Sequence, residues 1–288
     1  MRLLSVLTFP PLIARVSGST SFSMGNNTAT PGVITKMSLD EINKIRSGSV
    51  QPVHVKNDIL AEYTFPTEWP YTESDFERED ESSDSDFYSV PRFVTHIDDG
   101  AINGIKQLYS QVFREGDDVL DICSSWISHF PDSNVVRLGK VTGLGMNAAE
   151  LERNAALTDY DVKDLNKEAA FPYANESFDI AVNAVSVDYL TKPRDVFKEI
   201  HRVLRPGGLA VMTFSNRCFP TKVIGRWLRT TDDEHVRMVA TYFEHCGAKY
   251  ETIRGFQLQT SGGWDPLYAV MANKVSSSTD NETCESNL

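Results

Sequence analysis

Apolar residues in the middle of the chain follow two patterns that alternate. Short runs in which most residues are apolar, such as FDIAVNAVSV at 178–187, give way to longer stretches with an apolar residue at every third or fourth position. The first pattern is typical of strands covered on both faces, as in a parallel sheet, and the second of amphipathic helices. The apolar runs predict strands at 117–123, 141–147, 160–165, 178–187 and 208–216.

Helices are predicted beside these strands. After the fourth strand, Pro193 stands in the first turn of a stretch in which Phe197 and Ile200 have helical spacing. Near the end of the chain, the runs at 250–259 and 266–273 are close enough to pair as a hairpin. The pattern predicts an α/β protein with a Rossmann-like, doubly wound sheet of seven strands and an antiparallel C-terminal hairpin. The helices are expected at 101–113, 148–157, 193–204 and 231–247.

Composition divides the chain into a folded part and its flanks. No acidic residue precedes Asp40, and Ser and Thr are frequent there, which is typical of an organelle targeting peptide; an ordinary disordered tail is the alternative. The stretch 71–86 carries eight Asp and Glu residues against one Arg, so we expect a solvated linker. The predicted organisation is a targeting peptide or tail at 1–39, a poorly structured region at 40–86, a folded domain at 87–273 and a disordered tail at 274–288.

The charge and the cysteines exclude several classes of function. With 28 Lys and Arg against 40 Asp and Glu, the chain has a net charge of −12 and would repel a phosphate backbone, so no nucleic acid partner is expected. No apolar run reaches the roughly 20 residues that a transmembrane helix needs. The four cysteines form no C-x-x-C pair, and His235 and His245 lie ten residues apart, which does not place them on one helical face. Neither a metal site nor a disulfide framework is expected.

Ligands of a doubly wound sheet bind at the carboxyl ends of its strands, at the point where the strand order reverses. The residues at those ends are therefore the candidates for a binding site. They are Asp121, Cys123, Ser124 and Ser125 at the first strand; Gly145, Met146 and Asn147 at the second; Asp164 and Leu165 at the third; and Asn183 at the fourth.

Four segments of this region resemble successive motifs of the class I S-adenosylmethionine-dependent methyltransferases, in particular the branch with enzymes of ubiquinone and menaquinone biosynthesis. They are DDVLDIC, VTGLGMNAAELERN, FPYANESFDIAV and RVLRPGGLAVMTFSN, in the family's order over about residues 117–216. FYSVPRFVTHIDD and DVLDICSSWISHFP also resemble uncharacterised plant and algal, often plastid, methyltransferase-like proteins. The resemblance implies the class I methyltransferase fold, S-adenosyl-L-methionine as cofactor and a small-molecule acceptor. It favours the plastid if the N-terminus is a transit peptide, and the cytoplasm otherwise.

The resemblance assigns the residues at the four strand ends to the cofactor, but the loop after the first strand departs from the family's pattern. Asp121 keeps the acidic position of that loop. Cys123, Ser124 and Ser125 stand where the family has glycines, which permit a close approach of the backbone to the ligand. The three small residues still allow a tight turn, and the two hydroxyls are expected to bind the amino-acid end of the cofactor.

A second departure lies at the end of the second strand. Gly145 stands where the family has an Asp or Glu that binds the ribose hydroxyls, and Asn147 is expected to offer one hydrogen bond there. Asp164 matches the family's residue for the adenine amino group. The departures leave two functions open: a methyltransferase acting on a small molecule, or a catalytically degenerate protein of the same fold that serves as a binding or scaffold protein.

Direct in-line methyl transfer asks a protein mainly for alignment, with a base only when the acceptor must lose a proton. Asp188 and Tyr189 follow the fourth strand, where related enzymes carry substrate-facing groups. Either residue is a candidate general base or positions the acceptor, and a structural role is the alternative. Cys123 is expected to be a packed residue rather than a nucleophile, because no His is adjacent to it.

Two further groups are candidates for acceptor binding. Tyr88, Arg92 and His96 precede the first helix, where related enzymes often carry a segment that covers the cofactor. Arg92 is expected to pair with a carboxylate there, and the alternative is that the segment only packs on the sheet edge. Ser215 and Asn216 end the fifth strand on the same rim.

Overall fold

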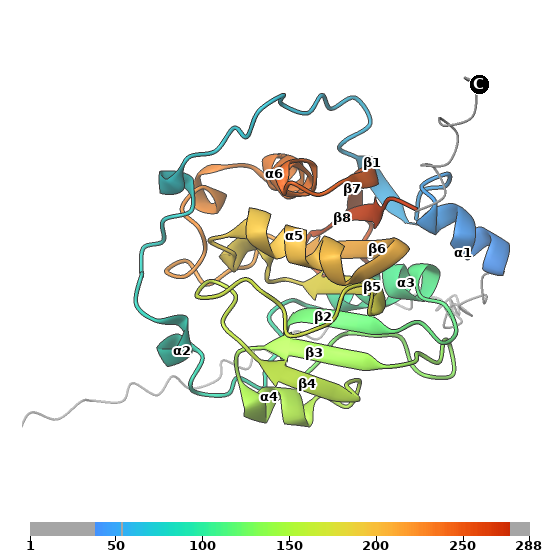
Figure 1. The fold of residues 1–288 in the computed structure, drawn as a ribbon, viewed down its shortest axis with the longest axis horizontal. Coiled ribbons are helices and arrows are strands. Elements are labelled where there is room, and N and C mark those ends of the chain that lie inside the picture. Colours follow the sequence, from blue (N-terminus) through green and yellow to red (C-terminus); the bar gives the residue numbers. More distant parts are fainter. Residues whose placement is uncertain (1–37, 53, 277–288) are drawn as a thin grey trace, which may run out of the picture. The chain divides into compact units, whose positions relative to one another are not determined.

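The computed structural model describes residues 38–52 and 54–276, which are built around one eight-stranded sheet (Figure 1). The strands lie in the order β1-β7-β8-β6-β5-β2-β3-β4. The five strands from β2 to β6 are parallel, and β8 lies antiparallel between β6 and β7. Their bounds are β1 (Val55–Asp58), β2 (Val119–Ser124), β3 (Val141–Gly145), β4 (Asp159–Val162), β5 (Phe178–Ala184), β6 (Leu204–Phe214), β7 (Tyr250–Leu258) and β8 (Leu267–Lys274).

The predicted α/β fold is confirmed, and all seven expected strands are present. The last two strands of the chain, β7 and β8, form the expected antiparallel pair. The strand expected at 178–187 ends three residues early. Val185 has a φ of 46°, in the left-handed region that a β-branched residue rarely adopts, so the chain leaves the strand there. A short 3-10 turn, Val187–Tyr189, follows.

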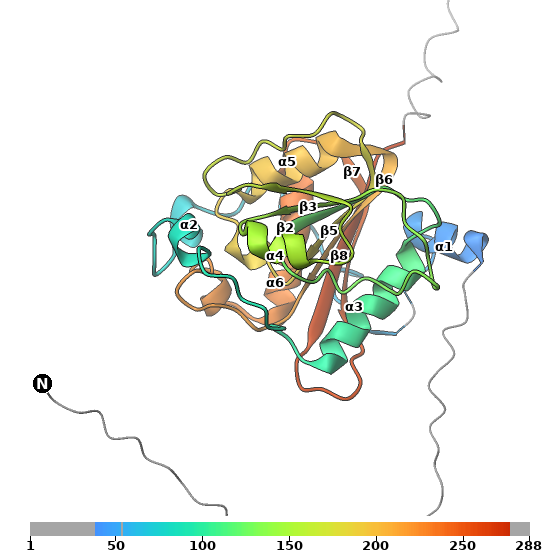
Figure 2. The same ribbon diagram turned by 90° about the horizontal axis from the view of Figure 1, so that it is seen from below.

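Helices cover both faces of the sheet. Alternate strand residues face opposite sides: Leu120 packs in the cluster that contains residues of α5 and α6, whereas Val119 packs in the cluster of α3. Figure 2 shows α5 and α3 on opposite sides of the strands. The helices are α1 (Leu39–Arg46), α2 (Asp84–Phe87), α3 (Asp99–Val112), α4 (Ala148–Arg153), α5 (Pro193–Val203) and α6 (Asp232–His245).

Local sequence sets the ends of these helices. Thr231 and Glu234 form a capping box that begins α6. Pro193 occupies the first turn of α5, as expected. The helix expected at 148–157 is shorter, because the Asn154 backbone is extended. The side-chain Nδ2 of Asn154 donates to the Ser125 carbonyl oxygen at 2.8 Å.

Residues 40–86 differ from the expectation of a poorly structured region ending in a solvated linker. They supply α1 and also β1, which pairs antiparallel with β7. In the acidic stretch, Asp84 is buried and pairs with Arg78 at 2.7 Å. Lys222, a cation distant in sequence, also faces Asp84, at 3.4 Å. Cations from distant parts of the chain thus offset the negative charge of this stretch. The local sequence does not indicate these contacts.

The expected flanking segments fall mainly outside the described residues. Of the proposed targeting peptide or tail at 1–39, only residues 38 and 39 are described, and of the tail at 274–288 only 274–276. Within the described part of the chain, no helix has both the length and the apolar character that crossing a membrane requires.

Candidate functional site

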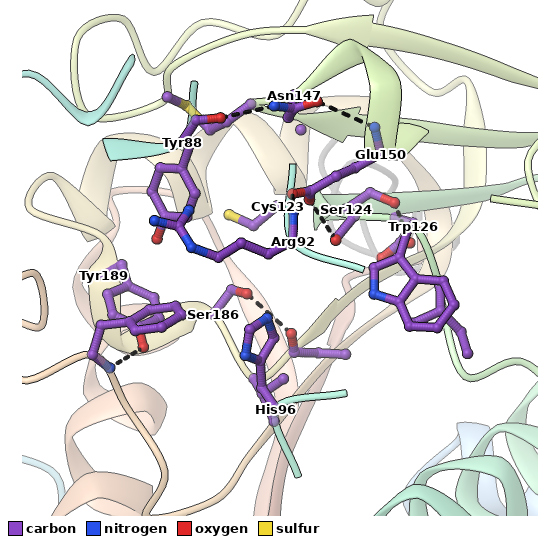
Figure 3. Close-up of a pocket in the computed structure, with 18 of the residues that line it drawn as sticks. Tyr88, Arg92, His96, Cys123, Ser124, Trp126, Asn147, Glu150, Ser186 and Tyr189 are labelled. Atoms are coloured by element: carbon purple, nitrogen blue, oxygen red, sulfur yellow. Dashed lines mark hydrogen bonds between the residues drawn. The ribbon is translucent and has the colours of Figure 1, made fainter. Parts of the chain in front are cut away.

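A cavity of about 330 Å³ lies at the carboxyl ends of the parallel strands. Its volume is within the range of small-molecule binding sites. The segment 84–97, which we name the strap, forms one wall (Figure 3). The other walls are the segments that follow β2, β3, β4, β5 and β6, at 121–129, 144–150, 163–166, 184–190 and 217–219.

The loop after β2 is held by hydrogen bonds between side chains. The carboxylate of Asp121, which is only 3% exposed, accepts from the hydroxyls of Ser124 at 2.6 Å and Ser128 at 2.7 Å. Burial raises the pKa of Asp121 to about 6, although both hydrogen bonds lower it. Cys123 has a φ of 56°, so it adopts the backbone conformation that glycine adopts most readily. Asp121 therefore organises this loop.

The side chains of Cys123, in β2, and His129, in the loop after it, are uncharged. Burial raises the pKa of the Cys123 thiol to about 12 and lowers the pKa of His129 to about 4. The thiol thus stays protonated and is a poor nucleophile. Among the described residues, no group of three or more His, Cys, Asp or Glu side chains is placed to hold a metal ion.

The end of β3 has no room for a side chain. A Cβ atom at Gly145 would collide with the backbone carbonyl oxygen of Ser124. The carboxylate on this side of the cavity instead comes from Glu150, in the first turn of α4. Glu150 accepts from the Ser125 hydroxyl and from the backbone N–H of Arg92, both at 2.6 Å. Sequence reasoning missed Glu150, since it lies five positions beyond the strand end.

The amide of Asn147, expected at the ribose, is engaged elsewhere. Its Nδ2 donates to the carbonyl oxygen of Tyr88 at 2.8 Å, and its Oδ1 accepts from the Glu150 backbone N–H at 3.2 Å. Asn147 therefore caps α4 and holds the strap. Trp126 fixes the strap again by donating from Nε1 to the Val94 carbonyl oxygen at 3.0 Å.

Three more of the expected cofactor residues line the cavity. Met146 and Leu165 contribute apolar surface there, and Asp164 lies beside Leu165. The Asp164 carboxylate accepts from the backbone N–H groups of Asn166 and Lys167, at 2.9 and 3.2 Å. Asn183 is not a lining residue: it is buried, and its Nδ2 donates to the Ile122 carbonyl oxygen at 3.0 Å.

The two catalytic candidates occupy different places. Tyr189 lines the cavity, and its hydroxyl accepts from the Phe219 backbone N–H at 2.7 Å. Asp188 is buried outside the lining, where its Oδ2 has no hydrogen-bond partner. Burial raises the pKa of both groups above their ordinary values, so the Tyr189 phenol keeps its proton at neutral pH. Asp188 is set apart from a role as a base by its position outside the lining.

Of the expected acceptor residues, the structure brings those of the strap to the cavity and leaves those of β6 outside. Tyr88, Arg92 and His96 line it, whereas Ser215 and Asn216 do not. The chain beyond β6 contributes the next three residues instead. Lining residues outside the expected set include Asp84, Trp126, Glu150, Lys163, Asn166, Ser186, Arg217, Cys218 and Phe219.

A buried ammonium group holds the first residue of the strap and the residues just before it. Lys222, 1% exposed, pairs with Asp84 at 3.4 Å and with Asp80 at 3.1 Å, and donates from Nζ to the Ser82 carbonyl oxygen at 2.7 Å. Asn166, after β4, donates to the Asp84 carboxylate at 2.9 Å. The strap is thus tied to the chain beyond β6 at one point and to the β4 end at another.

Comparisons with known proteins find similarity to methyltransferases. Residues 126–212 match the family model described as "Methyltransferase domain". Over 95 residues, the chain is 28% identical to malonyl-(acyl-carrier protein) O-methyltransferase of Marinomonas sp. (strain MWYL1). That match spans 32% of this chain and about a third (34%) of the relative.

Solved structures with a similar arrangement include an S-adenosylmethionine-dependent methyltransferase from Mesorhizobium loti. It is 18% identical with a TM-score of 0.38, over 56% of this chain and 92% of that one. Another is Haemonchus contortus phosphoethanolamine N-methyltransferase 2, 13% identical with a TM-score of 0.41, over 57% of this chain and 50% of that one. Residues 126–212 therefore match the sequence of a methyltransferase domain, and the sheet that carries them has a strand order that fits the class I, S-adenosylmethionine-dependent methyltransferase fold.

Proposed function

We propose that this protein transfers a methyl group from S-adenosylmethionine to a small-molecule acceptor bound in the cavity below the strap. One observation carries the proposal: the cavity lies where the strand order reverses between β2 and β5, and side chains from both halves of the sheet line it. Ligands of doubly wound sheets bind at this point.

The lining residues fit the cofactor. Gly145 lets the loop after β2 approach the end of β3, and Cys123 keeps the backbone conformation of a glycine there. Met146 and Leu165 offer apolar surface for a purine, with Asp164 beside them as an acceptor for its amino group. Glu150 supplies the carboxylate for the ribose hydroxyls that Gly145 cannot carry. S-adenosylmethionine would supply a methyl group on a positively charged sulfur.

The residues of the chain then align the acceptor with the methyl group and exclude water from the cavity. The strap covers the cavity and is held by Asn147, Trp126 and Lys222. Because burial raises the pKa of Tyr189, its phenol stays neutral and keeps a proton. Tyr189 thus positions the acceptor as a hydrogen-bond donor rather than acting as a base, and Asp188 supports the turn behind it.

The test is calorimetric titration of the full chain with S-adenosylmethionine and S-adenosylhomocysteine. The full chain is needed because residues before 87 supply β1 and Asp84. We expect micromolar dissociation constants for both compounds. Asp164→Ala should weaken binding by the value of a hydrogen bond to a charged group, about 1.5–3 kcal/mol. Glu251→Gln, on the exposed side of β7, should bind as the unchanged protein does.

The second candidate function is a binding or scaffold protein that has lost methyl transfer. The closed end of β3 at Gly145 and the engaged amide of Asn147 favour it, because both remove polar contacts expected for the ribose. Absence of binding by either compound up to millimolar concentration would support this candidate and contradict the first.

We also propose that the first 39 residues direct the chain to an organelle, with the plastid favoured. Their lack of acidic residues and their many hydroxyl groups support this. Mass spectrometry of the mature protein from its native source should find an N-terminus near residue 39. A mature protein that begins at Met1 would contradict the proposal.

A further inference from the structure

The strap brings into the cavity a cation that no carboxylate of the described residues pairs with. Arg92 donates from Nη2 to the Phe87 carbonyl oxygen at 2.9 Å, and its Nη1 is buried without a hydrogen-bond partner. Among the described residues, Arg92 forms no ion pair, whereas the lining cations Lys163 and Arg217 pair with carboxylates at 2.9 and 2.7 Å. Arg92 as a residue is half-buried, but its Nη1 is shielded from water, and polar groups so shielded are normally paired. This nitrogen is therefore available to an anion that enters the cavity.

The carboxylates nearby already have partners. Glu150 accepts from the Ser125 hydroxyl and from the backbone of Arg92, not from its guanidinium. Asp84 pairs with Arg78 and also receives a hydrogen bond from Asn166. These contacts hold the cavity walls in place, so a movement of either carboxylate toward Arg92 would break them.

Aromatic rings surround the guanidinium. Its central carbon lies 4.4 Å from the ring centre of Phe87, 5.6 Å from that of Phe219 and 5.7 Å from that of Tyr88. Figure 3 shows the Arg92 side chain reaching away from Trp126 toward Tyr88 and Tyr189. Its charged end thus lies toward the segments that follow β5 and β6, whereas Ser125 and Glu150, near its backbone, form the cofactor side.

We propose that Arg92 is the anion-binding residue of the acceptor site, and that the acceptor is an aromatic carboxylic acid. The planar guanidinium matches a carboxylate with two parallel hydrogen bonds, and the rings around it suit a flat apolar body. This assignment rests on the proposed function, because it takes the cofactor to occupy the side of Glu150. A carboxylate of the cofactor's own amino-acid end is the other source of the same chemistry.

The test compares a charged probe with its neutral match. The full chain is titrated with 4-hydroxybenzoate and with 4-hydroxybenzamide, with and without saturating S-adenosylhomocysteine. We expect the carboxylate to bind at least tenfold more tightly than the amide. Arg92→Gln should abolish that preference, and Arg92→Lys should retain part of it. Arg153→Gln is the matched control: its guanidinium also lies over a strap ring, 4.5 Å from the centre of Phe93, but it does not line the cavity.

Three results would overturn the proposal. The first is equal binding of the two probes to the unchanged protein, which does not depend on any variant folding. The second is a preference for the carboxylate that survives Arg92→Gln. The third is a loss of S-adenosylhomocysteine binding in Arg92→Gln with unchanged binding of 5′-methylthioadenosine, which lacks the carboxylate; this would assign Arg92 to the cofactor.

The same titrations separate this proposal from the proposed function. A preference for 4-hydroxybenzoate that Arg92→Gln removes, in a protein that binds no S-adenosylhomocysteine, would support the anion site and contradict methyl transfer. Thermal unfolding of Arg92→Gln provides the remaining control. A purely structural role would lower the unfolding temperature and leave the difference between the two probes unchanged, which would also overturn the proposal.

Discussion

The backbone carbonyl oxygen of Ser124 occupies the space where a side chain at Gly145 would begin. The β2–β3 register shifts at this point, between Ile122 and Ser124. The loop after β2 therefore rests directly on the end of β3. This contact accounts for the glycine at a position where an acidic residue was expected.

Gly145→Asp should not improve cofactor binding, although it restores the expected carboxylate. Its Cβ would displace the loop backbone, and overpacking of this kind typically costs about 1–3 kcal/mol of folding free energy. Gly145→Ala should lose a similar amount, because both changes introduce the same Cβ. Urea unfolding and titration with S-adenosylhomocysteine measure the two effects. Tighter binding by the Asp variant would refute this account of the loop.

Glu150→Gln should weaken S-adenosylhomocysteine binding by about 1.5–3 kcal/mol, the value of a hydrogen bond to a charged group. The loss should be much smaller for the 2′,3′-dideoxy analogue, which lacks the hydroxyls that Glu150 is proposed to bind. Glu152→Gln, an exposed change on the same helix, is the control. An equal loss for both ligands would mean that Glu150 only holds the strap and the loop.

Asp121 should make the protein less stable as the pH rises from about 4 to about 6. Its folded pKa, about 6, lies above the ordinary value of 3.8, so the folded state binds more protons than the unfolded state in this window. Each pKa unit between the folded and unfolded states changes the free energy of unfolding by about 1.4 kcal/mol. Asp121→Asn removes this titration, so its free energy of unfolding should rise relative to the unchanged protein across the window. Urea unfolding at several pH values measures it, and parallel curves would be the contrary result.

Lys222→Met should destabilise the protein by about 3 kcal/mol, the lower end for removing one partner of a buried ion pair, because Asp84 loses one of its two cations and the Ser82 carbonyl oxygen loses its donor. Hydrogen exchange should increase in the strap before it increases in the sheet. Lys198→Met, at an exposed position of α5, is the control and should change neither measurement. Uniform protection in the Lys222 variant would show that the strap does not depend on this anchor.

The apolar runs of the sequence predicted seven of the eight strands, because most of these strands are buried and such strands carry their signal locally. β1 was missed, since VKND contains a single apolar residue and is a strand only through its pairing with β7. The burial of Asp84 depends on Arg78 and Lys222, and Lys222 is distant in sequence.

The residues of the candidate site also fall into those that the sequence predicted and those that it did not. Strand ends placed Asp121, Gly145 and Asp164 at the cavity, because parallel strands bring their carboxyl ends to one edge. The position of Glu150 depends on where the Ser124 backbone lies, and the unpaired state of Arg92 depends on contacts across the whole cavity. Neither the position of Glu150 nor the lack of an ion pair at Arg92 can be predicted from the spacing of residues along the chain.

The short strand β1 also has a consequence for how this protein behaves outside its binding chemistry. It covers the outer edge of β7, whose backbone groups would otherwise be free to pair with another molecule. An uncovered edge strand is a template for aggregation, and a four-residue strand with exposed Lys56 and Asn57 is a poor one. A protein shortened to residues 87–288 would expose β7 and should self-associate through it. Residues far from the cavity thereby protect an edge of the sheet from pairing with other molecules.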